Sequence, residues 1–290
     1  MLKFFKYSAI LVFLTSSTFN QPDAKSYYES GMTSLNKKEY MQAIGEFTNA
    51  ISLNPGFADA YYYRAYAKDL LGKAMGFFSS ELCYDYVSAM KNGKTDAAVK
   101  LEKTCMNECY DLDGSFLEPE IVLCADFSSK VLSDLPEKSD QLVNLVRLNF
   151  FNNKITTLSD KWGKLTNLVV LDLSSNRITN MPPVIGKLSH LRELSLNKNQ
   201  IKELPYEFGS LKHLKTLNLR QNGLTSLPKS VAMLTSLENL DLALNPLTSL
   251  PLEISNLKNL KTLTLVGHEM SQKEQQKVKA LLPKTKIYFE

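Results

Sequence analysis

The chain has 290 residues, of which 44% are hydrophobic and 22% are charged. This composition is typical of a folded globular protein and excludes a disordered or collagen-like chain. Lysines and arginines number 34 against 30 acidic residues, and two of the lysines lie in an N-terminal segment that we expect to be removed. The mature chain is therefore close to neutral, which argues against electrostatic capture of nucleic acid.

The N-terminal segment has the pattern of a secretory signal peptide. Lys3 and Lys6 precede an apolar run from Tyr7 to Leu14, and small and polar residues follow it. The run is much shorter than the ~20 residues of a membrane span, so we expect residues 1–23 to be cleaved rather than to anchor the protein. The pattern leaves the cleavage site open, and a retained N-terminal helix is the alternative.

Export would place the mature protein in the periplasm, on the cell surface or in the medium. The first cysteine is Cys83, which excludes a lipid-modified cysteine at the cleavage point. No later apolar run is long enough to cross a bilayer, so we expect a mature chain without a membrane span, and a monomer. The sequence has no N-x-S/T glycosylation site, which favours a bacterial source over a secreted eukaryotic one.

Residues 24–110 carry a weak helical repeat. Small residues allow two helices to approach closely, an aromatic ring fills the gap between them, and a proline ends the second helix. These features resemble the signature of a tetratricopeptide repeat, at Gly31, Tyr40, Ala43, Phe47, Ala50 and Pro55. The resemblance implies antiparallel helical hairpins.

A second helical copy starts at Gly56 and has its second helix at about residues 80–91, after an insertion near residues 75–79. A fifth helix, from Thr95 to about Glu108, would cover its open end. Two such repeats are fewer than the three or more that usually stand alone. We therefore expect this half to be buried against the other half of the chain, through a short joint at residues 111–121.

The four cysteines lie close together, around the junction of the two halves: Cys83, Cys105, Cys109 and Cys124. In an exported chain this predicts disulfides. Cys105 and Cys109 are four residues apart on one predicted helix and are badly placed to bond each other, which favours Cys83 with Cys105 and Cys109 with Cys124. Four buried free thiols are the alternative. The C-x-x-C spacing is absent, so no metal site is predicted.

The second half has a strict period. Six leucine-framed segments recur every 23 residues, starting at Leu145, Leu168, Leu191, Leu214, Leu237 and Leu260. Each reads L-x-x-L-x-(L/F)-x-x-N, which resembles the leucine-rich repeat of plant disease-resistance proteins and Ras scaffolds. The resemblance implies one short parallel strand per repeat over residues 122–290. The expected fold is α plus α/β: tetratricopeptide-like helical hairpins followed by a horseshoe-shaped solenoid of parallel strands, with a helix and a strand as its C-terminal cap.

One asparagine per repeat forms a ladder that we expect to be structural: Asn153, Asn176, Asn199, Asn222 and Asn245. A buried amide can both donate and accept, and so can satisfy the backbone groups of the turn after each strand. His268 takes the last position of this ladder. A single histidine suggests catalysis, but no nucleophile or carboxylate is placed by the sequence to act with it.

The residues between the leucines should point outward from the concave sheet, because strand side chains alternate between faces. They form three outward columns: a first column that opens each strand, a middle column that closes it, and a third column two residues further on. A polar face of this size suits a protein or an extended peptide. The candidate partner-binding residues are Arg147, Asn149, Phe151, Asp172, Ser174, Glu193, Ser195, Asn197, Asn218, Arg220 and Asp241. Phe151 and Arg220 are favoured, since exposed aromatics and arginines often anchor interfaces.

Three functional hypotheses follow. The repeats favour an exported, noncatalytic scaffold that binds a protein or peptide on the concave sheet, without cofactor or metal. An intracellular regulator, similar to the leucine-rich scaffolds of small GTPases or kinases, is the alternative if the N-terminal segment is retained. An enzyme is disfavoured because repeats and caps account for the chain, and no P-loop, G-x-S-x-G, H-E-x-x-H or kinase signature is present.

Overall fold

The computed structural model describes residues 22–75, 81–105 and 122–290. The predicted signal segment up to residue 21, most of the predicted insertion, Cys109 and the joint at residues 111–121 lie outside the described residues. Among the described residues, no helix combines the length and apolar character needed to cross a bilayer.

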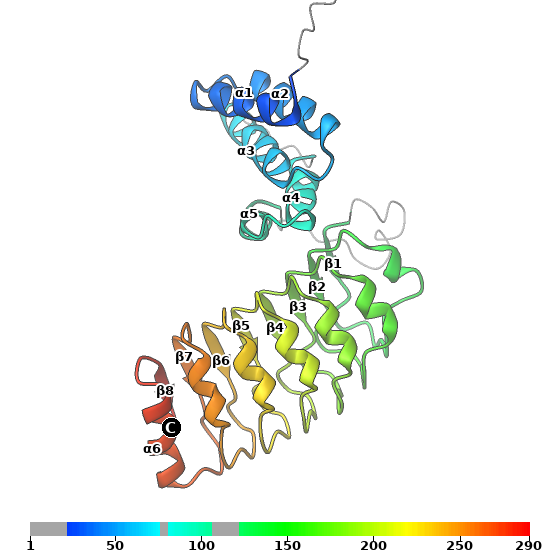
Figure 1. The fold of residues 1–290 in the computed structure, drawn as a ribbon. Helices are drawn as coiled ribbons and strands as arrows, with labels where there is room; N and C mark the ends of the chain where they lie inside the picture. The colour runs from blue at the N-terminus through cyan, green and yellow to red at the C-terminus, as the bar shows by residue number, and fades with distance from the viewer. Residues whose placement is uncertain (1–21, 76–80, 106–121) are drawn as a thin grey trace, which may run out of the picture.

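Five helices precede the sheet in the described part of the chain, and each packs against the next (Figure 1). They are α1 (Ala24–Asn36), α2 (Tyr40–Leu53), α3 (Ala58–Met75), α4 (Glu81–Lys91) and α5 (Asp96–Thr104). Figure 1 shows them stacked on one another, with α4 and α5 nearest the sheet and α1 and α2 farthest from it. The helical part was predicted, and α5 starts one residue after the expected Thr95.

The first two helices approach closely at Gly31. A Cβ atom added there would lie 2.7 Å from the ring of Phe47, so only glycine fits. Ala43 and Ala50 of α2 are fully buried in the same contact region. Small residues and one aromatic ring therefore bring α1 and α2 together, as the sequence pattern predicts.

Eight strands of three residues each form one open, all-parallel sheet in the order β1 to β8 (Figure 1). From β1 to β7, neighbouring strands are in register at 23-residue spacing, for example Arg147 with Val170 and Val170 with Glu193, and β8 follows at 24 residues. The strands are β1 (Cys124–Asp126), β2 (Arg147–Asn149), β3 (Val170–Asp172), β4 (Glu193–Ser195), β5 (Thr216–Asn218), β6 (Asn239–Asp241), β7 (Thr262–Thr264) and β8 (Lys286–Tyr288). The sequence period thus fixes both the number of residues per turn and the strand register.

A short 3₁₀ helix follows each strand from β1 to β6 and forms the convex side. These segments are η1 (Ser139–Gln141), η2 (Asp160–Lys164), η3 (Pro183–Lys187), η4 (Tyr206–Ser210), η5 (Lys229–Met233) and η6 (Leu252–Asn256). The framing leucines and the apolar residues of these helices fill one continuous core. Trp162, Ile185 and Phe208 are fully buried in it. The core therefore uses the predicted apolar residues, and mainly polar columns remain on the concave side.

The C-terminal cap consists of α6 (Gln272–Leu281) and β8. The hydroxyl of Ser271 accepts a hydrogen bond from the Glu274 backbone N–H at 3.3 Å, which caps the start of the helix. Val278 is fully buried against the last turn of the core. His268 ends the asparagine ladder: its Nδ1 accepts from the Met270 backbone N–H at 2.8 Å, and its ring packs on Phe289.

The asparagine ladder joins consecutive repeats. Asn199 donates to the carbonyl oxygens of Leu173 and Leu196, each at 3.0 Å, and accepts from the Ile178 backbone N–H at 2.9 Å. Asn153, Asn176, Asn222 and Asn245 repeat this pattern of two donated bonds and at least one accepted bond. Each side chain therefore satisfies buried backbone groups of its own repeat and of the preceding one.

The residues before strands β1 to β7 form a column that we name the edge column: Leu123, Val146, Val169, Arg192, Lys215, Glu238 and Lys261. Its first three members are buried in a core that also contains Val87 and Met90 of α4 and Leu101 of α5. Arg192 donates from its guanidinium to the Thr95 carbonyl oxygen at 2.7 Å. The helical part therefore packs along the strand edge from β1 to β4, which provides the burial that two helical repeats alone would lack.

Candidate partner-binding surface

The three outward columns lie on the concave side of the sheet. The central leucine of each strand is buried, for example Leu148 and Leu194, while the flanking residues face away from the core. Sequence reasoning placed all eleven candidate residues in these columns, and the strand register brings neighbouring members of each column next to one another. Their individual environments differ, however, and this divides them into structural and accessible groups.

The middle column has a structural task that the sequence interpretation missed. Asn149, Asp172, Asn218 and Asp241 each accept a hydrogen bond, through a side-chain oxygen, from the backbone N–H two residues further on, at 2.8–3.0 Å. Such local bonds are typical of Asn and Asp at the end of an extended segment. Ser195 alone breaks the Asn/Asp pattern between β2 and β6. The recurring Asn or Asp was the signal in the sequence, and it indicates turn formation as much as ligand binding.

Asp126 extends the middle column to β1. Its carboxylate accepts bonds from the Ser128 backbone N–H at 2.8 Å and from the Asn149 amide at 3.1 Å. Burial alone would raise the pKa of Asp126, but these hydrogen bonds outweigh burial, and the pKa lies below its ordinary value. The carboxylate is thus ionised and contributes negative charge to this end of the face.

The first and third columns carry the accessible side chains. Glu193 and Arg220 are exposed, and Phe151 is 41% exposed. Asn197 is half-buried beside Arg220 in the third column. Ser174 is only 4% exposed and donates its hydroxyl proton to Asp172, so a ligand meets little of its side chain.

The helical part narrows the open face. Val170, in the first column, is 6% exposed because it belongs to the core shared with α4 and α5. Arg147, next to it in register, has a buried Nε atom without a hydrogen-bond partner among the described residues. The first column is therefore open to a partner from Glu193 onward. In the sequence, the apolar residues Val146 and Val169 of the edge column indicate that the helical part covers this edge of the sheet.

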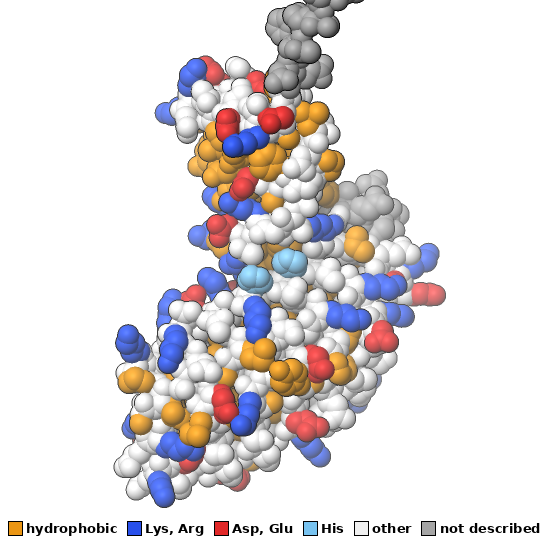
Figure 2. Space-filling view, viewed as in Figure 1, with side chains coloured by type: hydrophobic (Ala, Val, Ile, Leu, Met, Phe, Trp, Pro, Cys, Tyr) orange, Lys and Arg blue, Asp and Glu red, His pale blue; other side chains and the backbone are white. Residues whose placement is uncertain are grey.

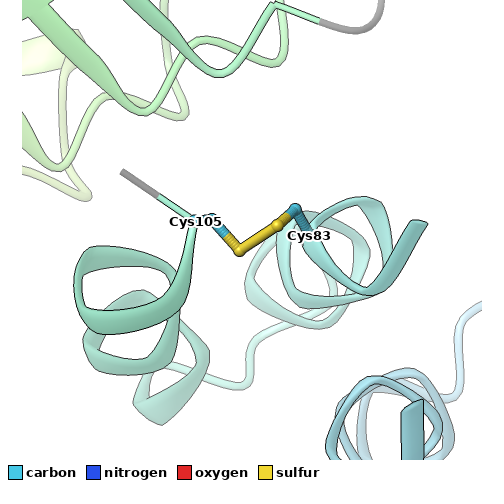
Figure 3. Close-up of a disulfide and its surroundings, with 2 residues drawn as sticks. All are labelled: Cys83 and Cys105. Carbon is cyan, nitrogen blue, oxygen red and sulfur yellow. A yellow bond between two sulfur atoms is a disulfide. The ribbon is translucent and has the colours of Figure 1, made fainter. Parts of the chain in front are cut away.

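A disulfide between Cys83 of α4 and Cys105 fixes the end of α5, with the two Cα atoms 5.8 Å apart (Figure 3). This is the pairing that the spacing favours. Cys124 in β1 is also disulfide-bonded, while its predicted partner Cys109 lies outside the described residues. The helices that flank the concave face are thus held by a covalent bond as well as by the shared core.

The face of the molecule shown in Figure 2 carries a mixture of acidic and basic side chains. In the parts of the chain that the structure describes, no group of three or more potential metal-ligating side chains gathers. The outward columns offer carboxylates, amides and hydroxyls, together with the guanidinium of Arg220 and the exposed ring of Phe151. These groups suit recognition of a polypeptide by hydrogen bonds, charge and one aromatic contact.

Comparisons with known proteins agree with this geometry. The profile of the "Leucine rich repeat" matches residues 143–201, and that of the "Leucine-rich repeat region" matches residues 183–286. A leucine-rich repeat protein of Leptospira interrogans is 37% identical with a TM-score of 0.54, over 59% of this chain and 43% of that chain. The chain thus spans less than half of that protein. No curated protein matches the chain significantly.

Two further solved structures are similar with lower TM-scores. The ectodomain of the plant membrane receptor kinase GASSHO1/SCHENGEN3 of Arabidopsis thaliana is 30% identical with a TM-score of 0.47, over 51% of this chain and 19% of that chain. An internalin of Listeria monocytogenes is 17% identical with a TM-score of 0.48, over 59% and 55%. With the 23-residue strand register and the asparagine ladder, the profile matches identify residues 143–286 of this chain as leucine-rich repeats.

Proposed function

We propose that this protein is a noncatalytic scaffold that binds a protein or peptide partner on its concave sheet. One observation carries the proposal: exposed Glu193, Arg220 and Phe151 share one open face, while the framing leucines are buried and the ladder asparagines are buried or half-buried. Eight strands at about 4.8 Å spacing give a face roughly 34 Å long. A face of this length accommodates an extended peptide or the surface of a small domain.

Structural positions of the histidines support a noncatalytic role. His190 donates through Nδ1 to the Thr166 carbonyl oxygen at 2.9 Å, and its ring stacks on that of His213. His268 is held by Met270 and Phe289 at the C-terminal cap. A general base needs a nucleophile within hydrogen-bond reach, and these contacts are instead with backbone groups and neighbouring rings.

We also propose that the protein is exported. The N-terminal pattern is that of a signal peptide, and the disulfide-bonded state of Cys83, Cys105 and Cys124 suits an oxidising compartment. An intracellular GTPase or kinase regulator would work in a reducing compartment, where such bonds are rare. Intact mass of the protein from its native source, before and after reduction, tests this: loss of roughly the first 17 to 24 residues with protected thiols supports export, and full length with four free thiols contradicts it.

The helical part is proposed to be a pair of tetratricopeptide repeats. The close contact of Gly31 with Phe47, and the alternation of α1 to α4 as two successive hairpins, support this assignment. Its role in the scaffold is to cover the edge column next to β1–β4, and thereby to border the concave face.

A matched pair of variants tests the concave face. Ser195→Arg places a long side chain in the centre of the middle column, and Ser210→Arg places the same side chain on η4 of the convex side, where Ser210 is exposed. Each protein is immobilised and used to capture partners from surface or periplasmic extract. We expect wild type and Ser210→Arg to capture the same partner and Ser195→Arg to lose it. Equal capture by all three proteins would exclude the concave face as the contact surface.

A further inference from the structure

Outside the concave face, charges are paired between neighbouring repeats. Lys164 pairs with Asp140 at 2.6 Å across η1 and η2, and Lys229 pairs with Glu253 at 2.9 Å across η5 and η6. In the edge column, Glu238 lies between two lysines, 3.3 Å from Lys215 and in contact with Lys261. These contacts use the repeat spacing itself, because residues 23 or 24 positions apart are neighbours in the solenoid.

Two exposed charges on the concave face differ from these. Among the residues described, Glu193 and Arg220 have no ion pair. The register explains why: the neighbours of Glu193 in its column are Val170 and Thr216, and neither carries a charge. Arg220 has Asn197 and Ala243 at the positions 23 residues before and after it. The repeat thus leaves Glu193 and Arg220 without a neighbour of opposite charge in their own columns.

The two charges are separated along the strand direction. Glu193 is in register with Thr216, and Arg220 follows Thr216 by four residues. At about 3.3 Å per residue along a strand and about 4.8 Å between strands, the two Cα atoms are roughly 14 Å apart. Four residues of an extended polypeptide span nearly the same distance. Half-buried Ser195, Thr216 and Asn218 lie between the two charges and offer polar groups to a ligand backbone.

We infer, building on the proposed concave site, that its ligand is an extended polypeptide segment that carries a basic side chain and, about four residues away, an acidic one. The basic side chain lies at Glu193 and the acidic side chain at Arg220. A uniformly anionic polymer would be repelled by Glu193 and by the carboxylates of Asp126 and Asp172 in the middle column. Because both charges are accessible to water, each contributes modest affinity and mainly decides which sequences bind.

Selection from a random twelve-residue peptide library displayed on phage tests this inference, because a random library favours no particular ligand. The disulfide-intact protein is used as wild type and as the variants Glu193→Arg, Arg220→Glu and the double exchange Glu193→Arg with Arg220→Glu. We expect wild type to enrich peptides with a basic and an acidic residue three to five positions apart. The Arg220→Glu variant should enrich peptides with two basic residues, and Glu193→Arg peptides with two acidic residues.

The double exchange is the decisive control. A free peptide can turn round on the face, so this variant should select the wild-type class again and bind a wild-type peptide within about twofold, while each single reversal weakens that peptide by about fivefold or more. Glu207→Arg, a reversal on exposed η4, should leave the selected class unchanged. Circular dichroism before selection checks that every variant is folded.

Two results overturn the inference. If wild type and both single reversals enrich the same sequences, or if no peptide is enriched, the two charges do not define the ligand. The proposed concave site is judged separately, by the Ser195→Arg and Ser210→Arg pair. If the charge reversals do not change which peptides are selected but Ser195→Arg abolishes their binding, the concave site stands and only the inferred pair of ligand charges is wrong.

Discussion

Arg192 links the fourth strand to the helical part through a hydrogen bond of 2.7 Å from its guanidinium to the Thr95 carbonyl oxygen. Although it carries a charge, Arg192 is only 9% exposed. It stands where the edge column changes from apolar residues under α4 and α5 to the exposed Lys215. The bond satisfies a carbonyl at the start of α5 and so marks the limit of the helical contact.

This position should matter for stability. Replacing Arg192 with Met removes a charged hydrogen bond made by a buried side chain, and we expect the free energy of unfolding to fall by about 1–3 kcal/mol. Lys215→Met, at the next and exposed position of the same column, should change it by less than about 1 kcal/mol. Urea denaturation followed by circular dichroism measures both variants. Equal losses would mean that the Thr95 contact adds nothing to docking.

The asparagine ladder predicts a larger effect. Asn199→Ala leaves the Ile178 N–H without its partner and removes one of the amide donors to each of the Leu173 and Leu196 carbonyls, so we expect a loss of about 2–4 kcal/mol in the free energy of unfolding. Asn197→Ala, two residues earlier and half-buried on the concave face, should stay within about 0.5 kcal/mol. The same denaturation experiment compares the two. A neutral Asn199→Ala would show that water replaces the amide.

Two glycines give opposite predictions for one substitution. Gly31→Ala places a methyl group 2.7 Å from the Phe47 ring, and we expect about 1–3 kcal/mol of destabilisation from overpacking. Gly45→Ala in α2 meets no atom within 4 Å and should stabilise the protein by up to about 1 kcal/mol, because alanine is the better helix former. Thermal melts distinguish the two. Stabilisation by both would contradict the close approach of α1 and α2.

The disulfide gives a fourth stability test. Replacing both Cys83 and Cys105 with Ser opens a loop closed over 22 residues, and the chain-entropy estimate is a loss of about 3 kcal/mol. Hydrogen exchange should show the loss first in α4 and α5, since these helices are joined by the bond. Unchanged protection of both helices in the variant would mean that the shared core alone holds them.

His213 predicts a pH dependence. Burial, together with the nearby His190 and Arg192, holds the pKa of His213 below its ordinary value of 6.5. The unfolded chain therefore binds a proton more readily than the folded one, and stability should fall as the pH drops through about 6.5 and below. Unfolding free energies at pH 7.5 and pH 5.5, for wild type and His213→Gln, isolate this contribution. The variant should lose less stability on acidification, and an identical loss would contradict the assignment.

The solenoid could be predicted well from the sequence because every repeat must meet the same physical requirements. Leucines must fill the core and an asparagine must satisfy the turn, so strand register, ladder and cap follow directly from spacing. The helical part was predicted from fewer positions, of which Gly31 and Phe47 carry direct contacts.

The candidate site was harder to predict, because outward side chains are not restricted by the core. Asp172 and Asn218 lie where the columns place them, but they also bond their own backbone. Val170 is buried by α4 and α5, which are far from it in the sequence, and a repeat pattern alone does not reveal such a contact. The edge column does contain a signal for this contact. Its first three members, Leu123, Val146 and Val169, are apolar, whereas the other four are charged. Three neighbouring apolar side chains at the edge of a sheet indicate that another part of the chain packs on them.

The change along the edge column also separates two kinds of repeat. The repeats up to β4 contact the helical part, whereas among the described residues the edge residues of β5 to β7 take no part in the core shared with the helices. Duplication or loss of a unit after β5 would change the length of the concave face by about 4.8 Å and leave the helical attachment intact. The length of the concave face can therefore vary through the number of later repeats, while the contact between the helical part and the first four strands stays the same.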